Sequence, residues 1–469
     1  MRHTFALFAL LFATASALGQ APKPALRAGA FAQDITPEKF PISVNGGFAD
    51  RKATAANDPL HARCLVLDDG SVKLAIVVVD SCMIPKELLD AAKALAEKKT
   101  GIPAANMLIS ATHTHTAPSV AGVFGSEPDA AYVKFLTEKI AVGIEKAFKQ
   151  LAPAKAAWAV GTEPNQVFNR RWKMKADVVN TDPFGGTTDK VKMNPGVQNP
   201  GLLEPAGPTD PSVTVLSLRT ADDKPLALFA NYSLHYVGDM PALSADYFGV
   251  FADVVGQKLK AGPGFVGMLS NGTSGDVNNI NFKDAAPKFK PGERSRLVAE
   301  AVADAAMKAL EKAEYRSDVK LNSGGLPLEL AVRKPTVEDV KRAEGILEKA
   351  KDRELRGPDE TYARETVLMA KYPDVVRIEL QVLRVGDLAI AAIPCEVFTE
   401  IGLSIKKNSP LKPTCVVSLA NGYFGYLPTA DQHKLGGYET WRARSSFLGV
   451  KSADEIEKSL GVLLKLVAK

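Results

Sequence analysis

Cysteine is scarce in this sequence, and its few occurrences exclude some common uses of the residue. The chain has four cysteines in 469 residues, each alone in an apolar stretch: Cys64, Cys82, Cys395 and Cys415. None forms the C-x-x-C spacing of many zinc and redox sites. Because a chain of this length can bury a large apolar core without cross-links, buried thiols are at least as well supported as a disulfide.

Long hydrophobic runs are also missing. The longest apolar run near the amino terminus, residues 5–12, is shorter than the roughly 20 residues needed to cross about 30 Å of hydrocarbon, which argues against a membrane anchor. With the basic Arg2 before it and Ala15-Ser16-Ala17 in A-x-A spacing after it, the run predicts a secretory signal peptide over residues 1–19. We therefore expect residues 20–469 to be a secreted or periplasmic protein without a transmembrane segment.

Basic clusters with interleaved aromatic residues are missing as well. The formal net charge of +5 is spread along the chain, which argues against a nucleic-acid-binding surface. A composition of 46% hydrophobic and 24% charged residues is that of an ordinary globular protein. No internal repeat or linker-like stretch divides the chain, so a single large domain is favoured over two.

Hydrophobic periodicity predicts alternating strands and helices, and hence an α/β protein with a mixed β-sheet core flanked by helices. Residues 74–79, 85–99 and 107–110 read as a β-α-β unit. Residues 164–211 lack periodicity and are expected to form a long loop. Residues 336–369 read as two charged helices on the outside of the domain. The other expected helices are 129–150, 247–260, 293–312 and 453–467, and the other strands include 154–160, 212–218, 226–231, 265–269, 375–385, 388–393 and 415–420.

Two of only six histidines follow the strand 107–110, as His113 and His115. In an extended backbone, side chains two residues apart point to the same side, so both imidazoles are expected to face one site at the end of this strand. One could bind a metal while the other acts as a second ligand or a proton carrier. The alternative is a pair of exposed or hydrogen-bonded histidines with no such role.

Three more polar residues follow other apolar strands: His235, Glu396 and Tyr426. Two histidines and one carboxylate can hold zinc and leave one position open for a water molecule, which zinc makes nucleophilic near neutral pH. Each residue also has an ordinary alternative, since His235 could be a core histidine, Glu396 an exposed carboxylate and Tyr426 a half-buried aromatic. The ligands are so far apart in the chain that their spacing does not decide between these interpretations.

Several segments, in order over residues 28–468, resemble the neutral/alkaline, non-lysosomal ceramidase family, whose members hydrolyse the amide of N-acylsphingosines. The matching segments are Ser110-Ala111-Thr112-His113-Thr114-His115, Asn169-Arg170, His235 with Ser244-Ala245-Asp246, Gly275-Asp276-Val277, Pro394-Cys395-Glu396, and the tyrosine-rich stretch from Asn421 to Glu439. Colinear agreement of this kind is more specific than any one motif.

The resemblance implies a single zinc ion (Zn2+) held by His113, His235, Glu396 and Tyr426. It also implies that His115, Arg170 and Tyr438 line the catalytic pocket. His115 is then the candidate proton carrier, and Arg170 and Tyr438 are the candidates to hold the substrate carbonyl as charge builds on its oxygen. Asp246 is expected to support His235 from behind.

The chain departs from the family pattern at Asn278, where the family has a serine that is a catalytic candidate. A metal-hydroxide mechanism does not need that serine, and Asn278 could instead donate a hydrogen bond to the substrate. Residues 336–369 look like a helical insertion, and the family's carboxyl-terminal immunoglobulin-like domain is not expected within this chain.

The leading hypothesis is an exported zinc-dependent hydrolase of linear amides, with a lipid or small-molecule amide as substrate and peripheral contact with a membrane surface. A catalytically idle relative that binds lipids or glycans is the second hypothesis. A metal hydrolase of esters or small cyclic amides is the third.

Overall fold

The computed structural model of this chain describes residues 25–469. The predicted signal peptide lies outside these residues. Within them, no helix combines the length and the apolar character needed to cross a membrane. All four cysteines are buried and free in the described part of the chain.

An eight-stranded mixed sheet forms most of the core, in the order β14-β13-β12-β7-β1-β4-β5-β6. Its first and last pairs, β13–β14 and β5–β6, are parallel, and the pairs between them are antiparallel. The strands are β1 (Arg27–Asp34), β4 (His61–Asp68), β5 (Lys73–Val79), β6 (Met107–Ala111), β7 (Ala152–Thr162), β12 (Ser212–Thr220), β13 (Pro225–Tyr232) and β14 (Val266–Asn271). The predicted β-α-β unit is confirmed, because α1 (Lys86–Thr100) joins the parallel strands β5 and β6.

A second, four-stranded sheet packs against the first, in the order β16-β17-β18-β20. Its strands are β16 (Leu321–Ala331), β17 (Val375–Val385), β18 (Leu388–Ala392) and β20 (Thr414–Val417). Side chains alternate between the two faces of each strand. In β18, Leu388 and Ile390 join the cluster shared with the large sheet, whereas Ala389 and Ala391 face the helices outside.

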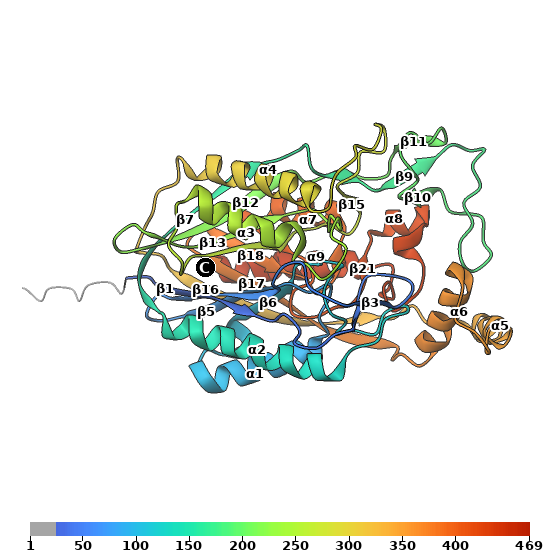
Figure 1. Ribbon diagram of the computed structural model, residues 1–469, viewed down its shortest axis with the longest axis horizontal. Helices are drawn as coiled ribbons and strands as arrows, with labels where there is room; N and C mark the ends of the chain where they lie inside the picture. The colour runs from blue at the N-terminus through green and yellow to red at the C-terminus, as the bar shows by residue number, and fades with distance from the viewer. Residues whose placement is uncertain (1–24) are drawn as a thin grey trace, which may run out of the picture.

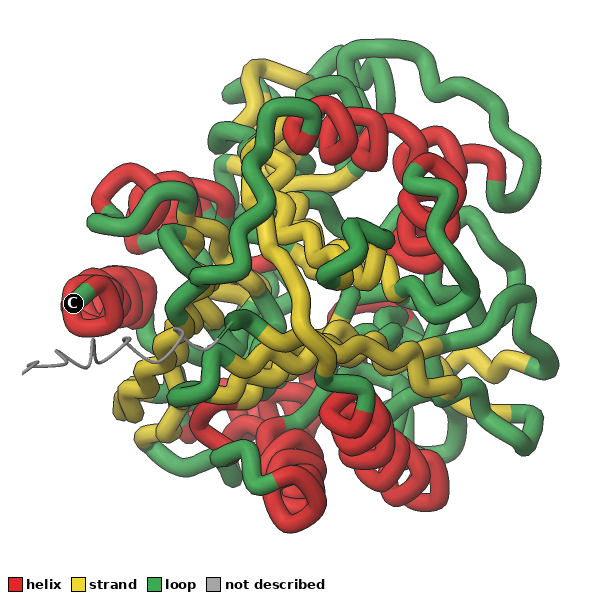
Figure 2. Tube along the Cα trace, turned by 90° about the vertical axis from the view of Figure 1, so that its left-hand side faces the viewer, coloured by secondary structure: helices red, strands yellow, loops and turns green. Residues whose placement is uncertain are grey.

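The strands enclose one central apolar cluster, and helices cover them from outside in three groups. The two halves of the eight-stranded sheet meet at β1 and β7, which pair only through Arg27 with Pro153 and Ala28 with Ala152 in the described residues. The helices are α1 with α2 (Ala130–Lys149), α3 (Asp246–Lys258) with α4 (Glu293–Leu310), and α7 (Thr399–Asn408) with α9 (Ser452–Ala468). Figure 1 shows the first two groups on opposite sides of the strands, and Figure 2 shows the helices outside the strands in the perpendicular view.

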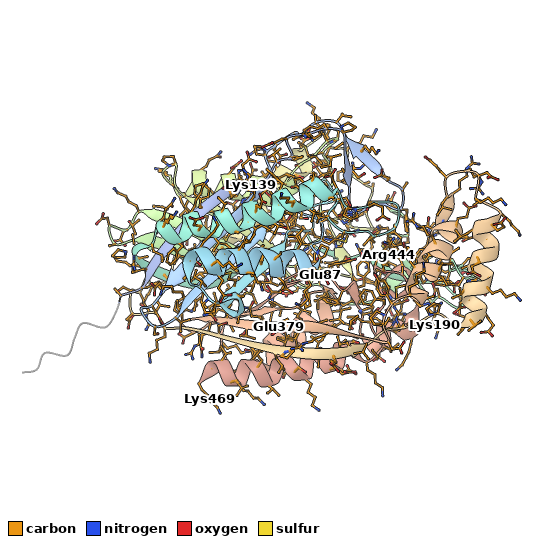
Figure 3. All side chains as sticks on the ribbon, turned by 90° about the horizontal axis from the view of Figure 1, so that it is seen from below. Glu87, Lys139, Lys190, Glu379, Arg444 and Lys469 are labelled. Carbon is orange, nitrogen blue, oxygen red and sulfur yellow. The ribbon has the colours of Figure 1, made fainter. Side chains whose placement is uncertain are left out.

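The side-chain view in Figure 3 shows the same layering through its labelled residues. Lys139 of α2 and Glu87 of α1 lie on one side, Lys469 at the end of α9 lies on the other, and Glu379 of β17 lies between them. The predicted α/β class, with a mixed sheet flanked by helices, is confirmed.

Local signals account for the ends of several helices. Asp129 caps α2 by accepting a hydrogen bond from the Tyr132 amide, and Gly101 ends α1 in the left-handed conformation. Thr336 and Asp339 form the reciprocal capping box expected at the start of α5 (Val337–Glu348). With α6 (Gly357–Ala370), α5 forms the predicted helical pair, at the right-hand end of Figure 1.

The sequence interpretation missed β1, β16 and α7. The sequence of β16, with Gly324, Gly325 and Pro327, lacks a strand pattern, but β16 is an edge strand of its sheet, and an edge tolerates these residues. The expected long loop over 164–211 also contains short strands: β8 (Phe168–Asn169), β9 (Arg171–Met174), β10 (Val191–Met193) and β11 (Leu202–Pro205).

Candidate metal centre and active site

The candidate site lies beyond the carboxyl ends of strands from both sheets. His113 follows β6, and His235 follows β13. Glu396 and Tyr426 begin two short parallel strands, β19 (Glu396–Val397) and β21 (Tyr426–Leu427), and are register partners there. The fold thus brings together His113, His235 and Glu396, which are remote in the sequence, and places Tyr426 beside Glu396.

The sequence argument that His113 and His115 share one side of an extended strand is wrong in its geometry. Strand β6 ends at Ala111, and His113 has a positive φ of 73°, in the left-handed region. The two imidazoles nevertheless meet, because this turn brings their Nε2 atoms to 3.2 Å from each other. The turn at His113, rather than an extended strand, therefore brings the two imidazoles together.

Three potential ligand atoms converge in the interior. Nε2 of His113 lies 3.0 Å from Nε2 of His235 and 3.2 Å from Oε2 of Glu396. All three side chains are almost fully buried. Ligand atoms of a tetrahedral zinc site, each about 2.0–2.1 Å from the ion, are about 3.3 Å apart, so these separations are near those that zinc requires.

Both imidazoles are held from behind by backbone carbonyls. Nδ1 of His113 lies 2.7 Å from the carbonyl oxygen of Cys82, and Nδ1 of His235 lies 3.1 Å from that of Ser274. A carbonyl can only accept, so Nδ1 carries a proton in each ring and Nε2 is the nitrogen that can bind a metal. Oε2 of Glu396 has no hydrogen-bond partner among the described residues.

The protonation states of the two histidines and the charge of Glu396 favour the binding of a cation. Burial lowers the pKa of His235 well below its usual value, and the nearby Arg170 lowers it further, so this ring is neutral at physiological pH. For His113, burial opposes the charged form, but Glu396 and Cys82 together outweigh burial and raise the pKa of His113 to about 10. A buried carboxylate oxygen and two imidazole nitrogens around one point form a donor set that a divalent ion satisfies better than one proton does.

His115 stands beside this group rather than within it. The ligand atoms of His113, His235 and Glu396 lie within 4.8 Å of one another, and His115 belongs instead to a second such set, with Cys82 and His113. The ring of His115 stacks on Tyr236, with 3.6 Å between ring centroids. Burial, and then the neighbouring His113, lower the pKa of His115 well below its usual value, so His115 is a neutral imidazole.

Arg170 reaches the same centre from the loop after β8. Its Nη1 lies 3.1 Å from Nε2 of His235, and its Nη2 donates to the Tyr426 hydroxyl at 3.1 Å and to the carbonyl oxygen of Gly275 at 2.9 Å. The Tyr438 ring packs edge-on against the Tyr426 ring, 5.7 Å away between centroids. The fold thus places the expected pocket residues Arg170 and Tyr438 around His113, His235 and Glu396, which we call the metal-competent group.

Asn278 and Asp246 have other partners. Asn278 donates to Oδ1 of Asn194 at 2.7 Å and accepts from the Ile280 amide at 3.0 Å. Asp246 accepts from the amides of Val237 and Gly238, so it orders the loop after His235. The direct support of His235 comes from the Ser274 carbonyl instead.

Sequence reasoning did not identify three residues that hold the site together. Tyr423 donates to Oε1 of Glu396 at 3.1 Å, Glu439 binds Arg170, and Gly46 packs against the ring of His115. Tyr423 and Glu439 lie in the tyrosine-rich segment noted in the sequence, which was a signal for both. Gly46 lies in the glycine-rich segment Asn45-Gly46-Gly47, and nothing in that segment indicated a contact with His115.

Comparisons with known proteins agree on the fold alone. No protein-family model matches the sequence, and no match was found among curated proteins. Among solved structures, the crystal structure of neutral ceramidase from Pseudomonas aeruginosa is similar, with a TM-score of 0.70 and 17% identity over 94% of this chain and 74% of that chain. A ceramidase complexed with C2 gives a TM-score of 0.69 and 17% identity over 94% and 75% of the two chains. The fold resembles that of neutral ceramidase.

Proposed function

We propose that this protein is an exported, zinc-dependent hydrolase of linear amide bonds, similar to neutral ceramidase. The observation that carries the proposal is the convergence of His113, His235 and Glu396, with a buried carboxylate oxygen that lacks a hydrogen-bond partner among the described residues. We assign the fourth ligand to Tyr426, which is the register partner of Glu396.

A zinc ion, when bound, supplies activation of a water molecule and polarisation of the substrate carbonyl. The chain's own residues do the rest. His115, neutral and half-buried beside His113, accepts a proton from the attacking water and delivers it to the leaving amine. Arg170 and Tyr438 hold the carbonyl oxygen as negative charge builds on it. Asn278 remains a candidate donor to the substrate, once it exchanges its bond to Asn194.

The substrate we propose is an N-acyl compound, either a lipid amide bound from a membrane surface or a small-molecule amide. The similarity in fold to two ceramidase structures supports the lipid amide. We assign residues 20–469 to one catalytic domain, with 336–369 as a helical insertion beside the site.

Zinc content and amide turnover together test the proposal. The purified protein is expected to contain one zinc per chain by mass spectrometry and to hydrolyse members of a panel of N-acyl compounds of different chain length. His113→Ala and Glu396→Ala are expected to lose both zinc and activity. His61→Ala, which removes a half-buried histidine at the start of β4, is the matched control and keeps both.

The panel also distinguishes the alternatives. Turnover of esters or cyclic amides in preference to linear amides would assign the site to the third hypothesis. Zinc binding without turnover of any compound would assign the chain to lipid or glycan binding, and full amidase activity in a metal-free protein would overturn the zinc mechanism.

A further inference from the structure

Glu439 is a buried carboxylate that bridges two arginines next to the site. It lies in the short helix Tyr438–Thr440 and is fully buried. Its Oε1 accepts from Nε of Arg170 at 2.9 Å, and its Oε2 accepts from Nη1 of Arg171 at 2.6 Å. The two arginines are themselves almost fully buried, so one carboxylate compensates two buried cations.

The bond to Glu439 leaves the other end of Arg170 for the site. A guanidinium is planar, so holding Nε fixes the direction of both terminal nitrogens. In this orientation Nη1 lies 3.1 Å from Nε2 of His235, and Nη2 reaches the Tyr426 hydroxyl at 3.1 Å. Arg170 therefore faces the metal-competent group with two N–H donors.

We propose that Glu439 is the positioning residue that aims Arg170 at the substrate oxygen and keeps it away from the metal ligand Glu396. This inference rests on the proposed function, in which Arg170 stabilises the developing negative charge. Oε2 of Glu396 lies 3.2 Å from Nε2 of His113 and has no hydrogen-bond partner among the described residues. An arginine released by Glu439 would be drawn to Glu396, and would then compete with the zinc ion for that ligand.

Arg171 keeps Glu439 in place while Arg170 engages a substrate. Besides Glu439, Arg171 donates to Oε1 of Gln432 at 3.2 Å and to the carbonyl oxygen of Gly436 at 2.7 Å. Both partners lie in or just after α8 (Ala430–Leu435). Glu439 therefore stays in place even when the bond to Arg170 loosens.

A double-mutant cycle on Glu439→Gln and Arg170→Ala tests the proposal. Glu439→Gln is expected to lower kcat by about 10–100-fold, as for other residues that orient a metal site from behind, and to lower zinc affinity by about 10-fold. Arg170→Ala is expected to lower kcat by about 100–1,000-fold. If Glu439 acts through Arg170, adding Glu439→Gln to Arg170→Ala changes kcat by less than about 3-fold.

Glu365→Gln is the matched control. Glu365 is also fully buried and binds an arginine through both oxygens, with Oε2 accepting from Nε and Oε1 from Nη2 of Arg444. Arg444 is labelled in Figure 3. The control is expected to cost similar thermal stability but to change kcat by less than about 3-fold, since neither partner contacts the site.

Three outcomes would overturn the inference: equal losses of activity in Glu439→Gln and Glu365→Gln, multiplied losses in the double variant, or unchanged zinc affinity in Glu439→Gln. Glu439→Asp, which keeps the charge, is expected to recover part of the kcat, and it replaces Glu439→Gln if that variant does not fold. If the wild type turns over no N-acyl compound, the proposed function fails. The zinc affinities of Glu439→Gln and Glu365→Gln then decide the inference by themselves.

Discussion

Tyr423 and Glu396 form a hydrogen bond that decides which carboxylate oxygen faces the metal-competent group. The Tyr423 hydroxyl donates to Oε1 at 3.1 Å, while Oε2 lies 3.2 Å from Nε2 of His113. One oxygen is therefore occupied by a neutral donor and the other is left for a cation. The bond also restricts rotation of the buried carboxylate.

Tyr423→Phe is expected to lower zinc affinity by about 10–100-fold, because the carboxylate loses its orienting donor while every ligand remains. Competition with a chelator of known affinity measures the change. Tyr315→Phe is the matched control, since it removes a tyrosine hydroxyl that donates to Ser217 at 2.8 Å elsewhere in the fold. Equal zinc affinities in the two variants would show that Tyr423 does not orient Glu396.

Zinc is expected to stabilise the folded protein in proportion to its binding. A ligand that binds only the native state adds about 2.7 kcal/mol at a free concentration 100 times its Kd. Thermal unfolding with and without a chelator measures this difference in the wild type. Glu396→Gln is expected to unfold at the same temperature in both conditions, because it lacks the charged ligand. A chelator-sensitive Glu396→Gln would place the stabilising ion elsewhere.

The regular elements could be predicted where the pattern is strong. The helices α2 and α4 and the strands β5 and β17 follow from apolar periodicity, since each buries one continuous face or both. Strand β16 could not be predicted in this way, because its outer positions are exposed and its place is set by pairing with β17 along eleven residues. That pairing is a property of the tertiary structure.

The sequence indicated which residue types gather at the candidate site, but not the residues that support them. Histidine and glutamate at strand ends are a chemical signal that can be read in the sequence. The bond between Arg170 and Glu439 joins residues 269 positions apart, and no local pattern marks either residue as the partner of the other. The position of His115 was expected for the wrong reason, since it depends on the left-handed turn at His113 rather than on an extended strand.

Gly46→Ala is expected to displace His115 without removing the metal. Gly46 has a φ of +104°, and a Cβ there would lie 2.4 Å from Nδ1 of His115. A shift of about 1 Å in a catalytic group can cost about 100-fold in rate, so kcat should fall by this order while zinc content stays at one per chain. Steady-state kinetics and mass spectrometry measure the two quantities.

Gly101→Ala is the control that distinguishes the contact with His115 from the backbone strain that any side chain causes at a positive φ. Gly101 also has a positive φ, of 69°, but a Cβ there meets nothing within 4 Å in the described part of the chain. Both variants are expected to lose on the order of 1 kcal/mol of stability from the left-handed conformation. If kcat falls in both variants, or in neither variant, Gly46 does not keep His115 in position.

Lys93 gives the protein a pH-dependent stability that is independent of the metal site. This lysine on α1 is buried and donates to Oδ1 of Asn421 at 2.8 Å. Burial lowers the pKa of Lys93 to about 8 from the usual 10.5. Between these two values the unfolded chain binds one proton more than the folded chain, so the free energy of unfolding rises with pH across this window.

Lys93→Met removes this dependence, because methionine has no proton to lose. At pH 8 and below, the wild type carries a cost on the order of 3 kcal/mol that the variant lacks. Urea unfolding at several pH values from 8 to 10.5 should therefore show the wild type gaining stability relative to Lys93→Met as the pH rises. Lys98→Met, an exposed lysine on the same helix, is the control and should run parallel to the wild type. A constant difference between wild type and Lys93→Met over this window would mean that the buried ammonium keeps its ordinary pKa, and that Asn421 compensates fully for its burial.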